Sequence, residues 1–211
     1  MSSGKTLQTL LSLSRSISPG PTPAFTTVHV SRAVLLVGDS GPIGRIELSR
    51  KLGLGEGAAR TIIKHLTAQN IVDPAKDGCV LTQRGKQLYK SLRSKLSEVR
   101  SVDAGQLALD KASAGVMVRN SAALVRRGIE QRDAAIRAGA TGACTLVYRK
   151  GKLTMPMGDR EEWTLETKDG LSDELLRCFE PRDEDVITIV SAPNESLAEH
   201  CAIAAALTLL G

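Results

Sequence analysis

The stretch from Gly44 to Thr82 restricts the possible folds of this chain more than any other part of the sequence. It begins with a short segment, residues 45–52, whose apolar side chains are spaced to face inward: Ile46, Leu48 and Leu52. A turn marked by Gly53 and Gly55 separates it from a second segment. There, apolar residues recur at four and three positions as one buried stripe: Ala59, Ile63 and Leu66. The pattern predicts a helix-turn-helix.

A two-stranded hairpin is expected directly after the second helix. Ile71 and Val72 begin one strand, residues 73–78 turn, and residues 79–81 form the partner strand. Asn70 stands where the helix should end, and asparagine tolerates the left-handed backbone of a helix C-cap. A hairpin in this position is typical of the wing of a winged helix.

Helices on both sides complete the predicted winged helix-turn-helix domain over residues 25–100. Apolar residues from Thr26 onward predict a first helix, and Ile43 can add a short strand. Thr82 can cap a last helix that reaches about Arg100. The apolar stripe of that helix is longer than a three-helix core requires, and it consists of Leu88, Leu92, Leu96 and Val99. The excess length indicates pairing with a second copy of the chain.

The segments that flank this domain have less regular patterns. Residues 1–24 are rich in Ser and Thr and end in a proline-rich run. They form either a mobile tail or, through the leucines between Leu7 and Leu13, a short amphipathic helix. Residues 101–111 are expected to be a linker.

Residues 112–211 alternate strands and helices in the order β-α-β-β-α-β-α. A hairpin is expected at Lys150-Gly151, a buried strand over residues 185–191, and an alanine-rich helix after Asn194. The whole chain is therefore predicted to be α+β. A small α+β sandwich with helices over one sheet would follow the N-terminal domain.

Charge divides the chain at nearly the same place. Residues 1–110 carry 15 Lys and Arg against 8 Asp and Glu, whereas residues 111–211 carry 13 against 15. A net charge of +7 beside one of −2 is typical of a nucleic-acid-binding module joined to another domain. Aromatic residues make up only 2% of the chain, which argues against single-strand binding by base stacking. Double-stranded DNA is the partner that the composition favours.

The residues expected to contact DNA are those left on the second helix after its buried stripe is subtracted. Arg60 and Thr61 are candidates for base edges, because arginine can bond guanine bidentately in the major groove. Gly57 keeps the first turn small, so that the backbone can approach a phosphate. Further candidates are expected to contact phosphates only: Arg45, Lys64, His65 and Lys76.

One polar cluster stands out in the second half of the chain, and it consists of Arg126, Glu130, Arg132 and Asp133. Two interpretations remain open. These side chains either hold a polar effector or a second subunit, or they form surface ion pairs along a helix over residues 121–138. Gly128 would cost that helix about 1 kcal/mol relative to alanine, which favours a close approach at this position.

Metal, cofactor and membrane binding are not indicated. The four cysteines are widely spaced, without a C-x-x-C or a nearby histidine pair, so reduced thiols are expected: Cys79, Cys144, Cys178 and Cys201. The glycines between Gly53 and Gly57 lack the strand and the G-K-[ST] ending of a phosphate-binding loop. No apolar run approaches the roughly 20 residues that span a bilayer. No signal peptide is evident, so a cytoplasmic protein is expected.

Several strings in the sequence resemble one particular family. They are Pro21-x-Pro23-x-Phe25, Ile43-Gly44-Arg45, the run from Leu52 to Gly57, Arg60-Thr61-Ile62, Leu81-Thr82-x-x-Gly85, the run from Gly128 to Asp133 and the run from Gly139 to Ala143. Over nearly its whole length the chain resembles an uncharacterised archaeal family regarded as winged-helix transcriptional regulators. The resemblance implies a regulator-like architecture with a C-terminal α+β domain of unknown function. It supplies no ligand, target site or activity.

Three hypotheses follow. The first is a DNA-binding transcriptional regulator, a homodimer whose recognition helices lie about one DNA turn apart. Its C-terminal domain would sense a small-molecule effector or dimerise. The second is a winged helix that binds another protein and not DNA. The third is an enzyme built on the C-terminal domain, although the three histidines are far apart and lack catalytic partners, so no enzyme is expected: His29, His65 and His200.

Overall fold

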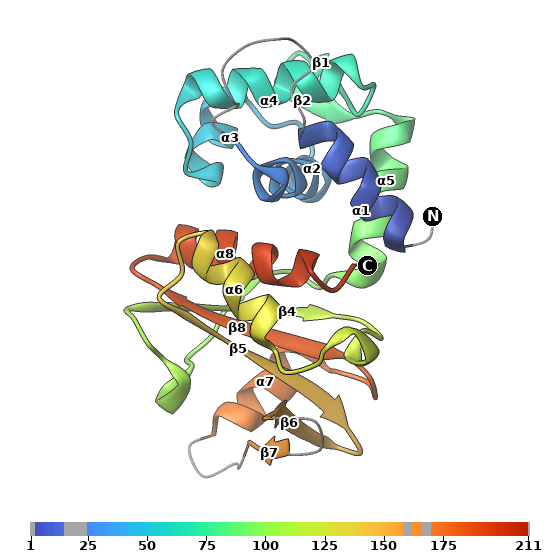
Figure 1. Ribbon diagram of the computed structural model, residues 1–211. Helices are drawn as coiled ribbons and strands as arrows, with labels where there is room; N and C mark the ends of the chain where they lie inside the picture. Colours follow the sequence, from blue (N-terminus) through green and yellow to red (C-terminus); the bar gives the residue numbers. More distant parts are fainter. Residues whose placement is uncertain (1–2, 15–24, 158–161, 166–169, 211) are drawn as a thin grey trace. The chain divides into compact units, whose positions relative to one another are not determined.

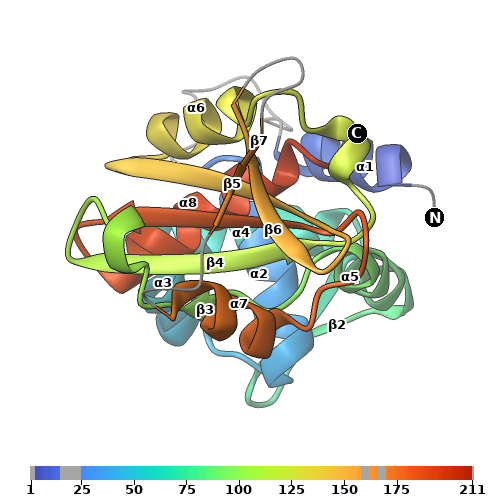
Figure 2. The same cartoon turned by 90° about the horizontal axis from the view of Figure 1, so that it is seen from below.

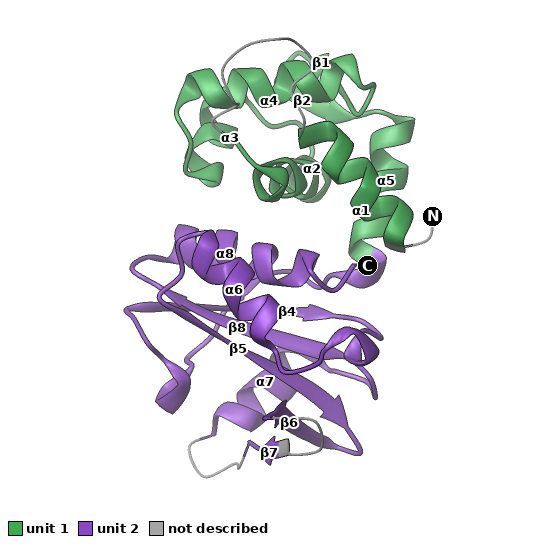
Figure 3. Cartoon of the chain, viewed as in Figure 1, with its two compact units in different colours: residues 1–93 green, residues 94–211 purple. Residues whose placement is uncertain are grey.

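The computed structural model describes residues 3–14, 25–157, 162–165 and 170–210. The chain divides into two compact units, Met1–Arg93 and Ser94–Gly211 (Figure 3). The division falls within helix α5 (Gln83–Lys95), earlier than the predicted domain boundary at residue 100.

The first unit consists of helices and one two-stranded antiparallel sheet (Figure 1). Its elements are α1 (Ser3–Ser14), α2 (Thr27–Ser40), α3 (Arg45–Leu52), α4 (Glu56–Ala68), β1 (Val72–Ala75), β2 (Gly78–Leu81) and α5. All the helices and strands that the sequence predicts between Gly44 and Thr82 are present in the predicted order.

Helix α1 decides between the two alternatives for the N-terminus. Leu10 and Leu13 are 0% and 2% exposed, and the hydroxyl groups of Thr6 and Ser91 are hydrogen-bonded at 2.5 Å. The short amphipathic helix is therefore formed and packed, because its leucines bury apolar surface. Residues 15–24, the rest of the predicted tail, lie outside the described residues.

The turns that bracket α4 use residues with left-handed backbone. Gly53 ends α3 at a φ of 67°, and its N–H donates to the carbonyl of Arg50 at 3.2 Å. At the other end, Asn70 has a φ of 56°. Its N–H donates to Thr67 at 2.9 Å, and the N–H of Ile71 donates to Leu66 at 2.8 Å, the two bonds of a Schellman motif. The predicted role of Asn70 is confirmed.

The hairpin is tied to the rest of the unit through Ile43. The backbones of Ile43 and Cys79 exchange hydrogen bonds of 3.2 and 3.0 Å, which confirms the predicted short strand as an isolated bridge. A Cβ atom at Gly78 would lie 2.3 Å from the Ile43 carbonyl oxygen, so only glycine fits there. Strand β1 continues to Ala75, so the turn is shorter than the predicted span of 73–78.

Two apolar side chains face differently from the sequence prediction. Ile46 is 65% exposed, because it lies in the first turn of α3, whereas Leu48 and Leu52 face the core as predicted. In α4 the fully buried isoleucine is Ile62, and Ile63 is only partly buried. The buried stripe of α4 therefore follows a spacing of three and four residues: Ala59, Ile62 and Leu66.

Helix α5 begins as predicted and ends early. The Thr82 hydroxyl accepts the N–H of Gly85 at 3.0 Å, which confirms its role as N-cap. The helix ends at Lys95 instead of about Arg100 because the chain joins the sheet of the second unit, where the N–H of Ser97 donates to Met117 at 2.9 Å. The excess helix that indicated pairing with a second copy is absent.

The second unit is built on one antiparallel sheet. Its elements are β3 (Arg100–Ser101), β4 (Ala112–Val118), α6 (Ile129–Arg137), β5 (Gly142–Arg149), β6 (Lys152–Pro156), β7 (Glu162–Thr164), α7 (Leu171–Phe179), β8 (Val186–Ala192) and α8 (Glu195–Leu207). The predicted β-α-β-β-α-β-α order is present, with β3 and β7 as additional short strands. The protein is α+β.

Helices cover both faces of this sheet, whose strand order is β3-β4-β8-β5-β6-β7 (Figure 2). Helices α6 and α8 lie on one face and α7 lies on the other (Figure 1). Alternation along β8 serves both sides: Ile187 and Ile189 pack with Leu175 of α7, and the intervening residues face α6 and α8. The central strands are therefore buried throughout.

The segment predicted as a linker is part of this unit. Strand β3 pairs with β4, Val102 is 6% exposed, and Ala104 is 1% exposed in the core under α7. Residues 101–111 thus contribute an edge strand and core side chains. The apolar runs in this segment are short and are interrupted by Asp103 and Gly105, so the sequence does not indicate a strand or core positions here.

Candidate nucleic-acid interface

Helix α4 presents a polar face that the fold does not use. Arg60, Thr61 and Lys64 are exposed, as the sequence predicts, on the side opposite the buried stripe. Their spacing at i, i+1 and i+4 places them along one side of the helix. No acidic residue follows Glu56 in α4, so positive charge dominates this face.

The start of α4 carries an ion pair. Arg45 Nη2 lies 3.1 Å from Glu56 Oε2, and the two side chains are 39% and 55% exposed. Arg45 therefore lies beside the first turn of α4, and Glu56 neutralises part of its charge. The sequence does not indicate this pairing, because the whole of α3 and the following turn separate Arg45 from Glu56.

Two glycines at the start of α4 have no internal explanation. A Cβ atom at Gly55 or Gly57 would meet no atom within 4 Å, and Gly55, the N-cap, has an ordinary φ of −65°. The fold therefore does not need glycine at either position, whereas it does need Gly78. Small residues beside uncapped helix amides leave room for a phosphate to approach the backbone.

Two other residues predicted to contact DNA, Thr61 and His65, already interact with neighbouring groups of the first unit. The Thr61 hydroxyl donates to the Gly57 carbonyl at 3.0 Å, so it is engaged within the helix. His65 is only partly exposed, and its ring meets that of Phe25 edge to face with centroids 5.5 Å apart. His65 is therefore less exposed than the sequence predicts, because its ring packs against Phe25.

Lys76 lies in the two-residue turn between β1 and β2 and is exposed. Residues 1–93 contain 13 Lys and Arg against 5 Asp and Glu, a net charge of +8, whereas residues 94–211 contain 15 against 18, a net charge of −3. The turn also carries Asp77, so the hairpin tip has no net charge, and the basic side chains of α4 form the more positive surface.

The polar cluster of the second unit is only partly a helix surface. Helix α6 begins at Ile129, so Arg126 precedes it and cannot form the expected helical pair with Glu130. Arg132 pairs with the neighbouring Asp133 at 3.1 Å, and Glu130 is exposed. Gly128 is the N-cap with a φ of 72° and does not lie inside the helix, which explains its glycine.

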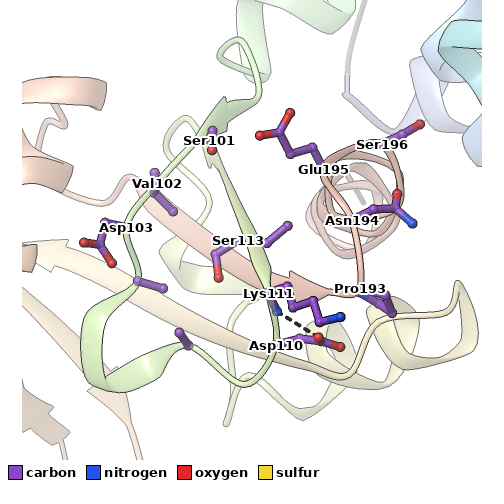
Figure 4. A pocket seen from close by; sticks show the side chains of 13 residues that line it. Ser101, Val102, Asp103, Asp110, Lys111, Ser113, Pro193, Asn194, Glu195 and Ser196 are labelled. Atoms are coloured by element: carbon purple, nitrogen blue, oxygen red, sulfur yellow. Dashed lines mark hydrogen bonds between the residues drawn. The ribbon is translucent and has the colours of Figure 1, made fainter.

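A hollow of about 680 Å³ lies between β3, β4 and the start of α8 (Figure 4). Two of its three acidic side chains, those of Asp103 and Asp110, are hydrogen-bonded within the fold. Asp110 accepts the Thr141 hydroxyl at 2.5 Å and the N–H of Lys111 at 2.8 Å, and the Thr141 bond lowers the pKa of this carboxyl. Asp103 accepts the N–H of Gly105 at 3.1 Å. In Figure 4 the polar side chains lie around the rim and do not converge on one point.

All four cysteines are free thiols. Burial raises the pKa of Cys144 to about 12, so this thiol stays protonated at neutral pH. Among the described residues, no group of three His, Cys, Asp or Glu side chains could hold a metal ion. Within the same residues, no helix has the length and apolar character needed to cross a membrane.

Comparison with known proteins places both units beside uncharacterised relatives. Residues 33–87 match the family described as PH0730-like, N-terminal domain, and residues 109–209 match the Domain of unknown function DUF4443. A similar solved structure is that of hypothetical protein PH0730 from Pyrococcus horikoshii OT3, with 27% identity and a TM-score of 0.70 over 88% of this chain and 92% of that one. A search of curated proteins found no match.

Proposed function

We propose that the first unit is a winged helix-turn-helix that binds double-stranded DNA, with α4 in the major groove and the β1–β2 hairpin as the wing. The observation that carries this proposal is the exposed face of α4, where Arg60 and Lys64 stand beside a first turn that has two glycines the fold does not require. A helix in the major groove needs this combination of base-reading and phosphate-binding groups.

The roles of the residues follow from their surroundings. Arg60 reads a base edge, and Thr61, whose hydroxyl bonds within the helix, offers its methyl group to the groove. Lys64 and Lys76 bind phosphates, and the amides near Gly57 bind another at the helix N-terminus. Arg45 also binds a phosphate when that phosphate displaces the Glu56 carboxylate from it.

With this DNA-binding unit, the protein would act as a transcriptional regulator. The second unit would sense an effector or mediate dimerisation. Occupancy of a pseudo-palindromic site by two copies would place the α4 helices about one DNA turn apart. An effector would change DNA affinity only by binding the two subunit arrangements unequally.

The test is a gel-shift titration of the full chain against duplex genomic fragments at two salt concentrations. We expect a subset of fragments to be retarded and the affinity to fall at higher salt, because phosphate binding releases counterions. Absence of duplex binding, or binding that does not depend on salt, would contradict the proposal.

A second candidate function is docking on another protein, and the exposure of Ile46 favours it. At 65% exposure this side chain is an apolar residue on the same helix as Arg45. Docking predicts that Ile46→Ser abolishes a stable protein complex in pull-down and that the chain has little duplex affinity. If Ile46→Ser leaves every complex intact, the docking function is excluded.

A further inference from the structure

A second hollow lies in the sheet unit, at the start of α6. Its volume is about 280 Å³, at the small end of ligand pockets. Residues of α6, β5, β6 and the segments next to them line it, among them Arg127, Gly128, Arg132, Thr145, Met155 and Met157. Basic groups, a helix N-terminus and apolar side chains therefore share one small cavity.

The helix N-terminus at this hollow has no side-chain cap. Gly128 is the N-cap and offers no side-chain oxygen to the amides of the first turn of α6. Those amides carry the partial positive charge of the helix, and Arg127 and Arg132 also line the hollow, with Arg132 paired to the neighbouring Asp133 at 3.1 Å. The electrostatic environment is suited to an anion.

Thr145 provides an independent observation on the floor of the same hollow. It is 4% exposed, and its hydroxyl oxygen is buried without a hydrogen-bond partner. A buried hydroxyl without a partner costs free energy, so such groups are rare unless a ligand or water completes them. A Cβ atom at Gly128 would lie 3.1 Å from Thr145 Cβ and 3.3 Å from its hydroxyl oxygen, so glycine keeps the space over this group open.

The apolar wall of the hollow comes from a place where two strands separate. The ladder between β5 and β6 ends at Val147 and Thr154, and the next residues of β6 diverge along the hollow. Met155 and Pro156 are partly exposed there, and Met157 is 60% exposed. Flexible methionine side chains suit an aliphatic group of variable shape.

We propose that this hollow binds a small carboxylate with a short aliphatic chain. The carboxylate would accept hydrogen bonds from the α6 amides, the Arg132 guanidinium and the Thr145 hydroxyl, and the chain would lie against Met155 and Met157. This deepens the proposed function by naming a class of effector. Ligand binding itself is measured without DNA, so a failure of either proposal leaves the other intact.

The experiment is an NMR titration of the full chain with hexanoate, with hexanol, hexylamine and inorganic phosphate as comparison ligands. We expect saturable binding of hexanoate and much weaker binding of the alcohol and the amine. If hexanoate does not bind, or if hexanol binds equally well, the proposal is wrong. Binding of phosphate without hexanoate would also overturn it.

Two variants and their matched controls locate the site. Thr145→Val should weaken hexanoate binding about tenfold, because it removes one hydrogen bond to a charged group. Thr188→Val is the control: Thr188 is paired with Thr145 across β5 and β8 and also has a buried hydroxyl without a partner, but it does not line the hollow. Both changes remove an unsatisfied buried hydroxyl, so both variants should fold.

Arg132→Gln tests the charge without touching the core, since Arg132 is exposed. It should weaken hexanoate binding by about tenfold. Arg137→Gln, in the last turn of the same helix, should leave binding unchanged. Equal binding by wild type, Thr145→Val and Arg132→Gln would overturn the proposed site.

Discussion

Arg45, the first residue of α3, and Glu56, the first residue of α4, form an ion pair with 3.1 Å between Nη2 and Oε2. The pair places an acidic group at the N-terminus of the helix proposed to enter the DNA groove. This carboxylate stabilises the helix through its dipole. It also repels a phosphate and occupies Arg45, so stability and DNA affinity should oppose each other at this position.

Glu56→Gln should therefore strengthen DNA binding several-fold and make it more dependent on salt. If Arg45, freed from Glu56, makes one additional phosphate contact, the negative slope of log K against log salt becomes steeper by about 0.9. The free energy of unfolding should fall by less than about 1 kcal/mol. Fluorescence anisotropy at several salt concentrations measures the first effect and denaturant titration the second. Unchanged DNA affinity would show that Arg45 and Glu56 lie away from the DNA.

Gly57→Ala should raise stability and lower DNA affinity in the same protein. A Cβ atom at Gly57 meets nothing within 4 Å, so alanine should stabilise α4 by up to about 1 kcal/mol. The methyl group would obstruct a phosphate at the helix N-terminus. Gly4→Ala is the control, because Gly4 also lies in an open helix start, in α1. If both variants bind DNA alike, backbone contact at Gly57 is excluded.

Thr82→Ala should destabilise the first unit by about 1–2 kcal/mol. The Thr82 hydroxyl accepts the N–H of Gly85 at 3.0 Å and donates to the Asn70 carbonyl at 2.7 Å, so it joins the cap of α5 to the end of α4. Thr82→Ser keeps both bonds and should lose much less. Denaturant midpoints of the two variants provide the measurement, and equal losses would show that the hydroxyl is not responsible.

His29 should make the first unit less stable in acid. Burial, with a smaller contribution from Arg32, lowers the pKa of His29 from 6.5 to about 4. Its neutral Nδ1 accepts the N–H of Thr26 at 3.1 Å at the start of α2. The unfolded chain thus binds more protons between pH 6.5 and about 4, so the free energy of unfolding falls as the pH is lowered through this window.

His29→Gln isolates this contribution, because glutamine can also bond the N-cap amide but does not titrate. The variant should lose less stability than wild type between neutral pH and about pH 4. Denaturant unfolding at both pH values measures the difference. The same acid loss in both proteins would assign the effect to other groups.

The sequence predicts the arrangement from Gly44 to Thr82 well because local rules decide it. Gly53 and Asn70 adopt left-handed backbone, and Thr82 caps a helix whatever lies around it. The hairpin at Lys150-Gly151 is another local case, since both residues have positive φ, as a two-residue turn requires. These signals depend on a few neighbouring residues and are therefore visible without the structure.

Features decided by distant contacts were missed. Helix α5 ends at Lys95 because the backbone that follows it forms hydrogen bonds with β4. Strand β4 lies about twenty residues later in the chain, so the sequence near Lys95 does not indicate this pairing. His65 is only partly exposed because its ring packs against that of Phe25, forty residues earlier in the chain. Thr145 lies beside the start of α6 only because the sheet places β5 there. A threonine within a strand does not by itself indicate a binding site in the sequence.

The most direct test of the proposed DNA-binding face is the salt dependence of duplex affinity. Fluorescence anisotropy measures it for wild type, Arg60→Ala, Lys64→Ala and Lys90→Ala. The duplexes are a fragment retarded in the gel-shift titration and forms of it with single base pairs substituted. Lys64→Ala should weaken binding to all the duplexes alike and reduce the salt slope by about 1, whereas Arg60→Ala should relax preference at one base pair by about 1–3 kcal/mol. Lys90→Ala, an equal loss of exposed charge on α5, should change neither. Equal effects of all three substitutions would contradict recognition through α4.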